Sequence, residues 1–345
     1  MRHSKKLSLL IASLALLAGA ALRPAAAVAA PEPAVTVLPF TNPSDVVSTG
    51  DRVFVSGGSE SKQIVVTDAA GAVIGTVDGL DGPTRLQLST DRRTLYVTLP
   101  PAGKIAAFDT RSLRRTATYD IGEGSCPSSL AYTGRYVWFG YGCENGDGNI
   151  GRIDLLRGPT LVTKGLADAF FYYPPLLASA TRNPRVLLAG NQRLSPSVDI
   201  AYAIGADGKL TRISATTSDD SGSNGRDVAL DPAGSTAFSA SGAPSQVQSY
   251  PVENMAKTGT AYETGSYPNA VEAARDGTRV AAGADAPFGP DVFVFNLDGT
   301  LVTQFEVGGS GDTLVPGALA WSPDGSRLYA VTEGGHLHVL PVPAA

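Results

Sequence analysis

The last stretch of the chain, Pro316–Pro343, reads PGALAWSPDGSRLYAVTEGGHLHVLPVP. Three short apolar runs alternate with a Pro-Asp-Gly turn at residues 323–325 and a Gly-Gly turn at residues 334–335. This alternation is typical of antiparallel strands that are joined by hairpins. The stretch therefore predicts three consecutive strands of one small antiparallel sheet.

The same unit recurs through the chain at a nearly constant spacing. Pro83 precedes Asp91 by eight residues, as Pro316 precedes Asp324, and an apolar run follows each aspartate. Looser copies bring the number of units to seven, and the units start at positions 43, 83, 127, 175, 225, 268 and 316. Intervals of 40 to 50 residues are expected of four-stranded propeller blades. The sequence therefore predicts an all-β fold, a seven-bladed β-propeller with four antiparallel strands in each blade.

The expected strands leave one position of the last blade unfilled. Third strands are expected at residues 63–67, 104–108, 149–153, 200–204, 246–250, 291–295 and 336–340, and fourth strands at 73–77, 115–119, 160–163, 210–213, 260–262 and 301–305. The seventh unit has no fourth strand, because the chain ends at Ala345. The β-branched run Ala34–Leu38 precedes the first unit, so we expect this N-terminal strand to complete the last blade and close the ring.

The first residues have the pattern of an export signal. A basic start is followed by the apolar stretch 7–22, and Ala27-Val28-Ala29 fits a cleavage site. The apolar stretch is shorter than the roughly 20 residues that a membrane-spanning helix needs. We therefore expect a signal peptide at residues 1–29 and no membrane span after its cleavage, with an uncleaved anchor as the alternative. The alanine-rich leader suggests a bacterial protein, secreted to the medium or associated with the cell envelope.

Cleavage after Ala29 also changes the charge of the chain. The leader holds four positive charges and no negative ones, so the formal net charge of −5 becomes −9. An acidic chain without a run of Lys or Arg argues against a nucleic-acid partner. The repeat covers the remaining chain without a linker, which favours a single propeller domain at residues 30–345 and a monomer.

The two cysteines, Cys126 and Cys143, lie at equal distances from the turn at residues 133–136. In a hairpin they would face each other on the first and second strands of the third blade, at a separation that suits a disulfide. In an exported protein this favours a structural crosslink. The alternative is a redox-active pair, but no basic residue or helix start is positioned to lower a thiol pKa.

Two segments, Leu95-Tyr96-Val97-Thr98 and SPDGSRLYAVT at residues 322–332, resemble the YVTN-type β-propeller repeat, which is related in shape to WD40-like and lactonase-like seven-bladed proteins. The resemblance covers essentially the whole chain after the leader, although Leu99 replaces the usual Asn and blades one, three and four are degenerate. It implies a secreted or periplasmic propeller in which binding is commoner than catalysis. Likeness of fold does not assign a reaction.

Histidine is scarce after the leader. His336 and His338 alternate along one expected strand and so share a face, where they could serve as metal ligands or as an acid–base pair. Lyase-type propellers that cleave lactone-containing substrates depend on a histidine site, and no third histidine completes one here. We therefore expect a solvated strand at this place and name no catalytic residue.

An acidic stretch, DSGSNGRDVALD at residues 220–231, can be aligned with a calcium-binding loop. Gly222 stands where that loop has a ligand, and no helix flanks the stretch, so a polar loop between blades is the alternative. The calcium hypothesis rests on Asp219, Asp220 and Asp227. No other cofactor is expected.

Loops that lead into first strands share one face of a propeller with loops that join second to third strands. We call this the upper face, and the opposite one the lower face. The run Phe170-Phe171-Tyr172-Tyr173 is expected there beside charged residues, a mixture typical of ligand sites. Alternatively, some of these rings fill the seam between two blades. The candidate ligand-binding residues are Phe171, Tyr172, Tyr173, Arg85, Arg193, Arg226, Asp227, Tyr267, Asn269 and Glu272.

These observations favour a secreted binding or interaction scaffold whose upper face engages a protein, a glycan or a small molecule. One alternative is a lactonase- or lyase-like enzyme on the same scaffold, which would bring a carboxylate, an arginine and a histidine together at the mouth of the channel. A second alternative is a structural component of the cell envelope.

Overall fold

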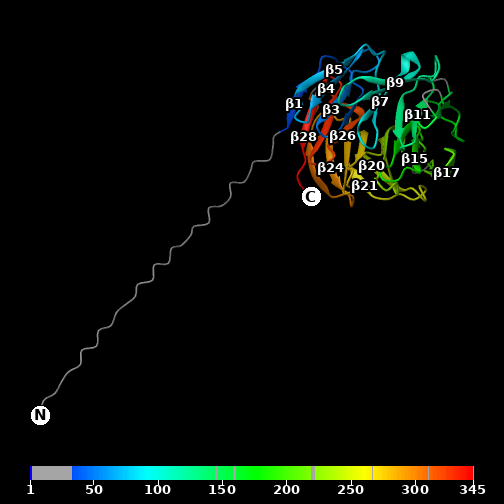
Figure 1. The fold of residues 1–345 in the computed structure, drawn as a ribbon. Coiled ribbons are helices and arrows are strands. Elements are labelled where there is room, and N and C mark those ends of the chain that lie inside the picture. The colour runs from blue at the N-terminus through cyan, green and yellow to red at the C-terminus, as the bar shows by residue number, and fades with distance from the viewer. Residues whose placement is uncertain are drawn as a thin grey trace. The chain divides into compact units, whose positions relative to one another are not determined.

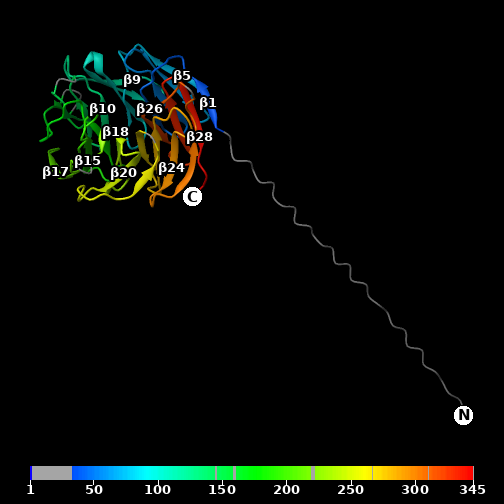
Figure 2. The ribbon, with the colours of Figure 1, turned by 180° about the vertical axis from the view of Figure 1, so that it is seen from behind.

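The computed structural model describes Met1 and residues 33–143, 146–157, 161–218, 222–265, 267–309 and 311–344. The expected signal peptide, apart from Met1, lies outside these residues. The described residues form seven antiparallel sheets of four strands each, arranged as the blades of a ring (Figures 1 and 2). The predicted seven-bladed β-propeller is confirmed. Within this part of the chain, no helix has the length and apolar character needed to cross a membrane.

Each blade runs from an inner first strand to an outer fourth strand. The strands of blades 1 to 3 are β2 (Asp45–Ser48), β3 (Arg52–Ser56), β4 (Gln63–Asp68) and β5 (Val73–Asp78); β6 (Leu86–Leu88), β7 (Thr94–Leu99), β8 (Lys104–Asp109) and β9 (Arg115–Asp120); and β10 (Ser129–Tyr132), β11 (Tyr136–Tyr141), β12 (Asn149–Asp154) and β13 (Val162–Thr163). A short 3-10 helix, η1 (Pro100–Ala102), joins β7 to β8.

Blades 4 to 7 repeat the arrangement. Their strands are β14 (Leu176–Ser179), β15 (Val186–Gly190), β16 (Asp199–Ile204) and β17 (Leu210–Ala215); β18 (Ser223–Leu230), β19 (Thr236–Ala243), β20 (Gln246–Pro251) and β21 (Ala261–Glu263); β22 (Pro268–Ala273), β23 (Arg279–Ala284), β24 (Val292–Asn296) and β25 (Leu301–Phe305); and β26 (Leu314–Trp321), β27 (Arg327–Thr332), β28 (His336–Pro341) and β1 (Ala34–Val37). The first strands of neighbouring blades contact one another around the whole ring.

The N-terminal strand β1 completes the last blade, as predicted. It pairs with β28 in antiparallel register from Ala34 opposite Val339 to Val37 opposite His336, and Figure 1 shows blue β1 beside red β28. The next residue, Leu38, is 6% exposed, and its amide donates a hydrogen bond to the carbonyl of Gly335 at 2.8 Å. Strand pairing and one buried side chain thus join the two ends of the propeller.

The hydrophobic core is divided among the seams between blades. Successive side chains of a strand point to opposite faces of its sheet, so each blade contributes to two seams. On β3, for example, Val53 and Val55 pack in the cluster shared with blade 7, whereas Phe54 packs in the cluster shared with blade 2. Leu38 belongs to the cluster between blades 7 and 1. Stability therefore depends on every blade having both neighbours.

The first strands of blades 5, 6 and 7 are irregular at their upper ends. The sequence did not predict this irregularity. Their pairing with the second strands is shifted, whereas the first strands of blades 1 to 4 pair without a shift. The shifts lie between Gly225 and Asp227, between Pro268 and Ala270, and between Leu314 and Leu319. Such bulges re-aim side chains and are commonly found beside functional sites.

The predicted disulfide between Cys126 and Cys143 is confirmed, with the two Cα atoms 5.4 Å apart. Both cysteines lie just beyond the ends of β10 and β11 rather than on them. Ser129 pairs with Gly140, and three further residues in each direction lead to the two cysteines. The hairpin register therefore brings the thiols together, although regular pairing has already ended.

Candidate functional site

Two hollows lie along the inner strands of the propeller. The first is a cavity of about 220 Å³ in the central channel, lined by residues from the first strands of all seven blades. The second is a pocket of about 150 Å³ on the upper face, where blades 5, 6 and 7 meet. We call the second one the bulge pocket, and its walls consist of Arg226, Tyr267, Pro268, Asn269, Asp285, Thr313, Leu314, Pro316 and Glu333.

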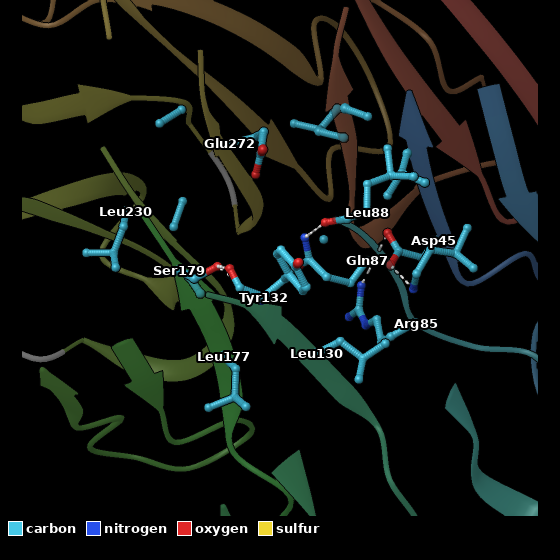
Figure 3. A pocket seen from close by; sticks show the side chains of 18 of the residues that line it. Asp45, Arg85, Gln87, Leu88, Leu130, Tyr132, Leu177, Ser179, Leu230 and Glu272 are labelled. Carbon is cyan, nitrogen blue, oxygen red and sulfur yellow. Dashed lines mark hydrogen bonds and ion pairs between the residues drawn. The ribbon is translucent and has the colours of Figure 1, made fainter. Parts of the chain in front are cut away.

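Asp45 stands at the start of β2 and ties blade 1 to blade 2. One carboxylate oxygen accepts a hydrogen bond from the amide of Val46 at 2.8 Å, and the other accepts one from the amide of Leu86 at 2.8 Å. The guanidinium of Arg85 lies 3.9 Å from the carboxylate. Burial raises the pKa of Asp45 to about 6, although Arg85 and the two amides oppose this shift. Asp45 and Arg85 both line the cavity, where Figure 3 shows them next to each other.

Asp227 on β18 ties blade 5 to blade 6 in the same way as Asp45 ties blade 1 to blade 2. Its carboxylate accepts hydrogen bonds from the amides of Val228 and Val271, each at 2.9 Å. Burial raises its pKa to about 7, against the opposing charge of Arg85. Asp45 and Asp227 each stand two residues after the start of a repeat unit, at positions 43 and 225. The same position of the repeat thus carries, in blades 1 and 5, an aspartate that accepts an amide hydrogen bond from the next blade.

Glu272 on β22 is the third carboxyl group of the channel. Its side chain lines the cavity and is accessible to water there, although protein surrounds the cavity. Burial raises the pKa of Glu272 to about 8, Asp227 and Asp45 add to the shift, and Arg275 opposes it. Figure 3 shows that Glu272 and the Asp45–Arg85 pair approach the same cavity from different blades. The channel therefore holds three carboxyl groups whose pKa values are all raised above their usual range, that of Glu272 the most.

This arrangement makes the stability of the protein depend on pH. A carboxyl group whose pKa is raised by folding stabilises the folded state fully below its unfolded pKa of about 4, and the contribution is lost as the pH rises through the folded pKa. We expect Glu272→Gln to raise the melting temperature at pH 8, because the amide puts no charge into the cavity and none beside Asp227, and to leave it nearly unchanged at pH 5.

Thermal unfolding of both proteins at the two pH values tests this, with Glu263→Gln at an exposed position on β21 as the control. His338 acts in the opposite direction between about pH 6.5 and 4, because burial lowers its pKa to about 4. Both proteins keep His338, so its effect cancels in the comparison. An equal change at the two pH values, or a lower melting temperature of Glu272→Gln at pH 8, would contradict the expectation.

Neither histidine that the structure describes lines the cavity or the bulge pocket. The Nδ1 atom of His336 lies 2.8 Å from a carboxylate oxygen of Asp312, which also accepts a hydrogen bond from the Thr332 hydroxyl at 2.7 Å. His338 is only 8% exposed, so the expectation of a solvated strand is wrong for this residue. Its ring is enclosed because it faces the seam and because β1 covers the outer edge of β28. The combination of carboxylate, arginine and histidine that the enzyme alternative requires does not form in the described part of the channel.

The aromatic run before blade 4 alternates between core and surface. Phe171 is fully buried in the seam between blades 3 and 4, whereas Phe170 is 70% and Tyr172 42% exposed. Tyr173 is half-buried and forms an edge-to-face pair with Tyr172, with ring centroids 4.9 Å apart. The guanidinium of Arg193 lies 5.9 Å from the centre of the Tyr173 ring. The seam interpretation thus holds for Phe171, whereas the exposed rings of the run stay candidates for ligand binding.

The structure divides the candidate ligand-binding residues among four places. Arg85, Asp227 and Glu272 line the channel cavity, and Arg226, Tyr267 and Asn269 line the bulge pocket. Tyr172, Tyr173 and Arg193 form an aromatic patch beside blade 4, and Phe171 lies in the core. The sequence reasoning missed Asp45, Arg275, Asp285 and Glu333. The equivalence of Asp45 and Asp227 in the repeat could have revealed the first, but no sequence signal marks the other three.

Of the three residues in the calcium hypothesis, the structure describes only Asp227. Asp219 and Asp220 lie outside the described residues. Both carboxylate oxygens of Asp227 accept amide hydrogen bonds, as described above. Among the residues that the structure places, no three His, Cys, Asp or Glu side chains come together as a metal site would require.

Comparison with known proteins adds no relative. No protein-family model matches the chain, and no curated protein matches its sequence. The likeness to YVTN-type repeats therefore remains a resemblance in two segments, and the structure itself establishes the seven-bladed β-propeller.

Proposed function

We propose that this chain is a secreted binding protein whose upper face engages a protein, a glycan or a small molecule. The observation that carries the proposal is the distribution of exposed aromatic rings. Among the described residues, the exposed aromatic side chains are Phe170, Tyr172, Tyr267 and Phe288. Phe170 and Tyr172 precede the first strand of blade 4, Tyr267 precedes that of blade 6, and Phe288 lies between β23 and β24. All four therefore lie on the upper face.

Exposed aromatic rings are costly to leave in water and are enriched where partners bind. The exposed aliphatic residues lie elsewhere, on outer strands such as β1 and β5 or in lower-face turns, as Leu156 and Leu297 do. The backbone of Tyr267 adds to the argument. Its φ of 39° is in the left-handed region, which a residue with a bulky side chain rarely adopts without a functional or packing reason. Secretion is supported by the leader and by the disulfide, which persists in oxidising compartments.

Labelled protein applied to glycan and peptide arrays tests the proposal. We expect Phe170→Ser/Tyr172→Ser to weaken binding to the wild-type ligands at least about tenfold, because each ring contributes on the order of 1 kcal/mol or more to an interface. The matched control, Leu156→Ser/Leu297→Ser, removes two exposed apolar side chains from the lower face and should bind as wild type does. Equal binding by the upper-face variant, or loss of binding by the control, would place the interaction elsewhere.

A further inference from the structure

We propose that the bulge pocket binds a cationic side chain, a guanidinium or an ammonium group, of a ligand on the upper face. The inference rests on the proposed function and names the chemistry of one part of the ligand. Two carboxylates, an unpartnered buried acceptor and an exposed aromatic ring meet there.

The pocket exists because three consecutive first strands depart from regular pairing. Arg226 and Asn269 are the extra residues of the bulges in β18 and β22, and Pro316 lies within the irregular part of β26. All three residues line the pocket. A bulge turns the extra side chain away from the direction that the alternation of the strand would give it. The departure from regular pairing in the first strands of blades 5, 6 and 7 thus supplies three of the residues that line this hollow.

Two carboxylates lie at the pocket, each on a loop whose backbone is held in place. The amide of Asp285 donates a hydrogen bond to the carbonyl of Tyr267 at 2.9 Å, and the amide of Glu333 donates one to the carbonyl of Thr313 at 2.8 Å. No described Lys, Arg or His forms an ion pair with Asp285 or Glu333. Both side chains are exposed and therefore accessible to a ligand.

Asn269 provides an acceptor that lacks a donor. The residue is 3% exposed, and its Nδ2 atom donates a hydrogen bond to the carbonyl of Leu314 at 2.9 Å. This bond fixes the orientation of the amide and leaves the buried Oδ1 atom without a hydrogen-bond partner. A buried acceptor without a donor costs roughly 1–3 kcal/mol. Ammonium and guanidinium groups carry donors only, so they complement the two carboxylates and this amide oxygen.

Arg226 and Tyr267, which also line the pocket, are compatible with a cationic ligand. Arg226 brings a positive charge, but the amide oxygen of Asn224, oriented toward it, accepts hydrogen bonds from Nε at 3.3 Å and Nη2 at 3.2 Å. One guanidinium therefore faces two carboxylates, and the balance of charge in the pocket is negative. The ring of Tyr267 is 59% exposed and can receive a cation on its face.

The volume of the bulge pocket and the side chains that line it favour an organic cation over a metal ion. A volume of about 150 Å³ is below the range of pockets that enclose whole drug-sized molecules, so it suits the end of a side chain. A metal ion would need further ligands, and no described group of three His, Cys, Asp or Glu includes Asp285 and Glu333.

The distribution of charge over the propeller agrees with this assignment. Among the described residues, Asp and Glu outnumber Lys and Arg on the upper side, and the reverse holds on the lower side. Lower-face turns carry Arg92, Arg93, Arg111, Arg114, Arg182 and Arg185. An acidic upper face attracts cationic ligands and repels anionic ones during approach.

Ligand-observed saturation-transfer NMR tests the assignment on the whole protein. The probes are Nα-acetyl-lysine methylamide, Nα-acetyl-arginine methylamide and the neutral Nα-acetyl-glutamine methylamide. We expect at least one cationic probe to bind at millimolar concentration, the neutral probe to bind at least about tenfold more weakly, and Asp285→Asn/Glu333→Gln to weaken cation binding by a similar factor. Asp81→Asn/Glu123→Gln makes the same change in charge on the upper face outside the pocket and should bind as wild type does.

The assignment is overturned if no cationic probe gives a signal, if the neutral probe binds equally well, or if the control weakens binding as much as the pocket variant. Phe170→Ser/Tyr172→Ser should leave probe binding unchanged, because neither residue lines the pocket. Probe binding that fails while array binding still depends on Phe170 and Tyr172 refutes the cation pocket alone. If Phe170→Ser/Tyr172→Ser binds the arrays as strongly as wild type does, only the proposed function is refuted.

Discussion

Deleting residues 34–38 is expected to lower the free energy of unfolding by about 5 kcal/mol. Burial of a leucine side chain contributes roughly 2–3 kcal/mol, and each backbone hydrogen bond of the β1–β28 pair adds on the order of 1 kcal/mol. A typical domain has a total stability of only about 5–15 kcal/mol. The truncated protein should also associate, because the deletion exposes the edge of β28 from His336 to Val339. Urea denaturation and size-exclusion chromatography measure the two effects.

Two point substitutions distinguish a loss of ring closure from a general effect of shortening the chain. Leu38 is 6% exposed and packs in the cluster between blades 7 and 1, whereas Val37 is 72% exposed. Leu38→Ala should cost about 2–4 kcal/mol and Val37→Ala less than about 0.5 kcal/mol. If the truncated protein unfolds at the same urea concentration as wild type, or if the two substitutions have equal effects, the N-terminal strand does not hold the ring closed.

The repeat explains why the architecture could be predicted from the sequence. Pro-Asp-Gly and Gly-Gly turns at constant spacing specify where strands end, and apolar alternation specifies which runs are strands. The fourth strand expected at 73–77 is β5 (Val73–Asp78), and the third strand expected at 336–340 is β28. Closure followed from counting alone, because seven units of four strands were one strand short at the C-terminus. These are local signals, which a single sequence contains.

The functional residues were harder to predict because they depend on departures from the repeat. The bulges of β18, β22 and β26 place Arg226 and Asn269 in one pocket with Asp285 and Glu333, which are far apart in sequence. A bulge changes register by one residue or a few and leaves no mark in a pattern of apolar spacing. The aromatic run shows the same limit, since alternation predicts that Phe171 and Tyr172 point in opposite directions but not which one is buried.

Loss of the disulfide is the second large effect that we expect. Closing a loop of this length contributes about 3 kcal/mol by restricting the unfolded chain, so Cys143→Ser should lower the melting temperature by roughly 5 °C, at about 1–2 °C per kcal/mol for a chain of this size. The far-UV circular dichroism spectrum should not change, because both cysteines lie outside β10 and β11.

Three further measurements distinguish the lost crosslink from a damaged side-chain environment. Cys126→Ser/Cys143→Ser should melt at the temperature of the single variant, and a reductant should lower the melting temperature of wild type but not that of the double variant. Cys126 has a φ of 45°, in the region that glycine adopts freely. Cys126→Gly/Cys143→Ser should therefore be more stable than the double serine variant by a few tenths of a kcal/mol to about 1 kcal/mol. A reductant that leaves wild type unaffected, with full reduction shown by thiol titration, would mean that the hairpin register alone holds this part of blade 3.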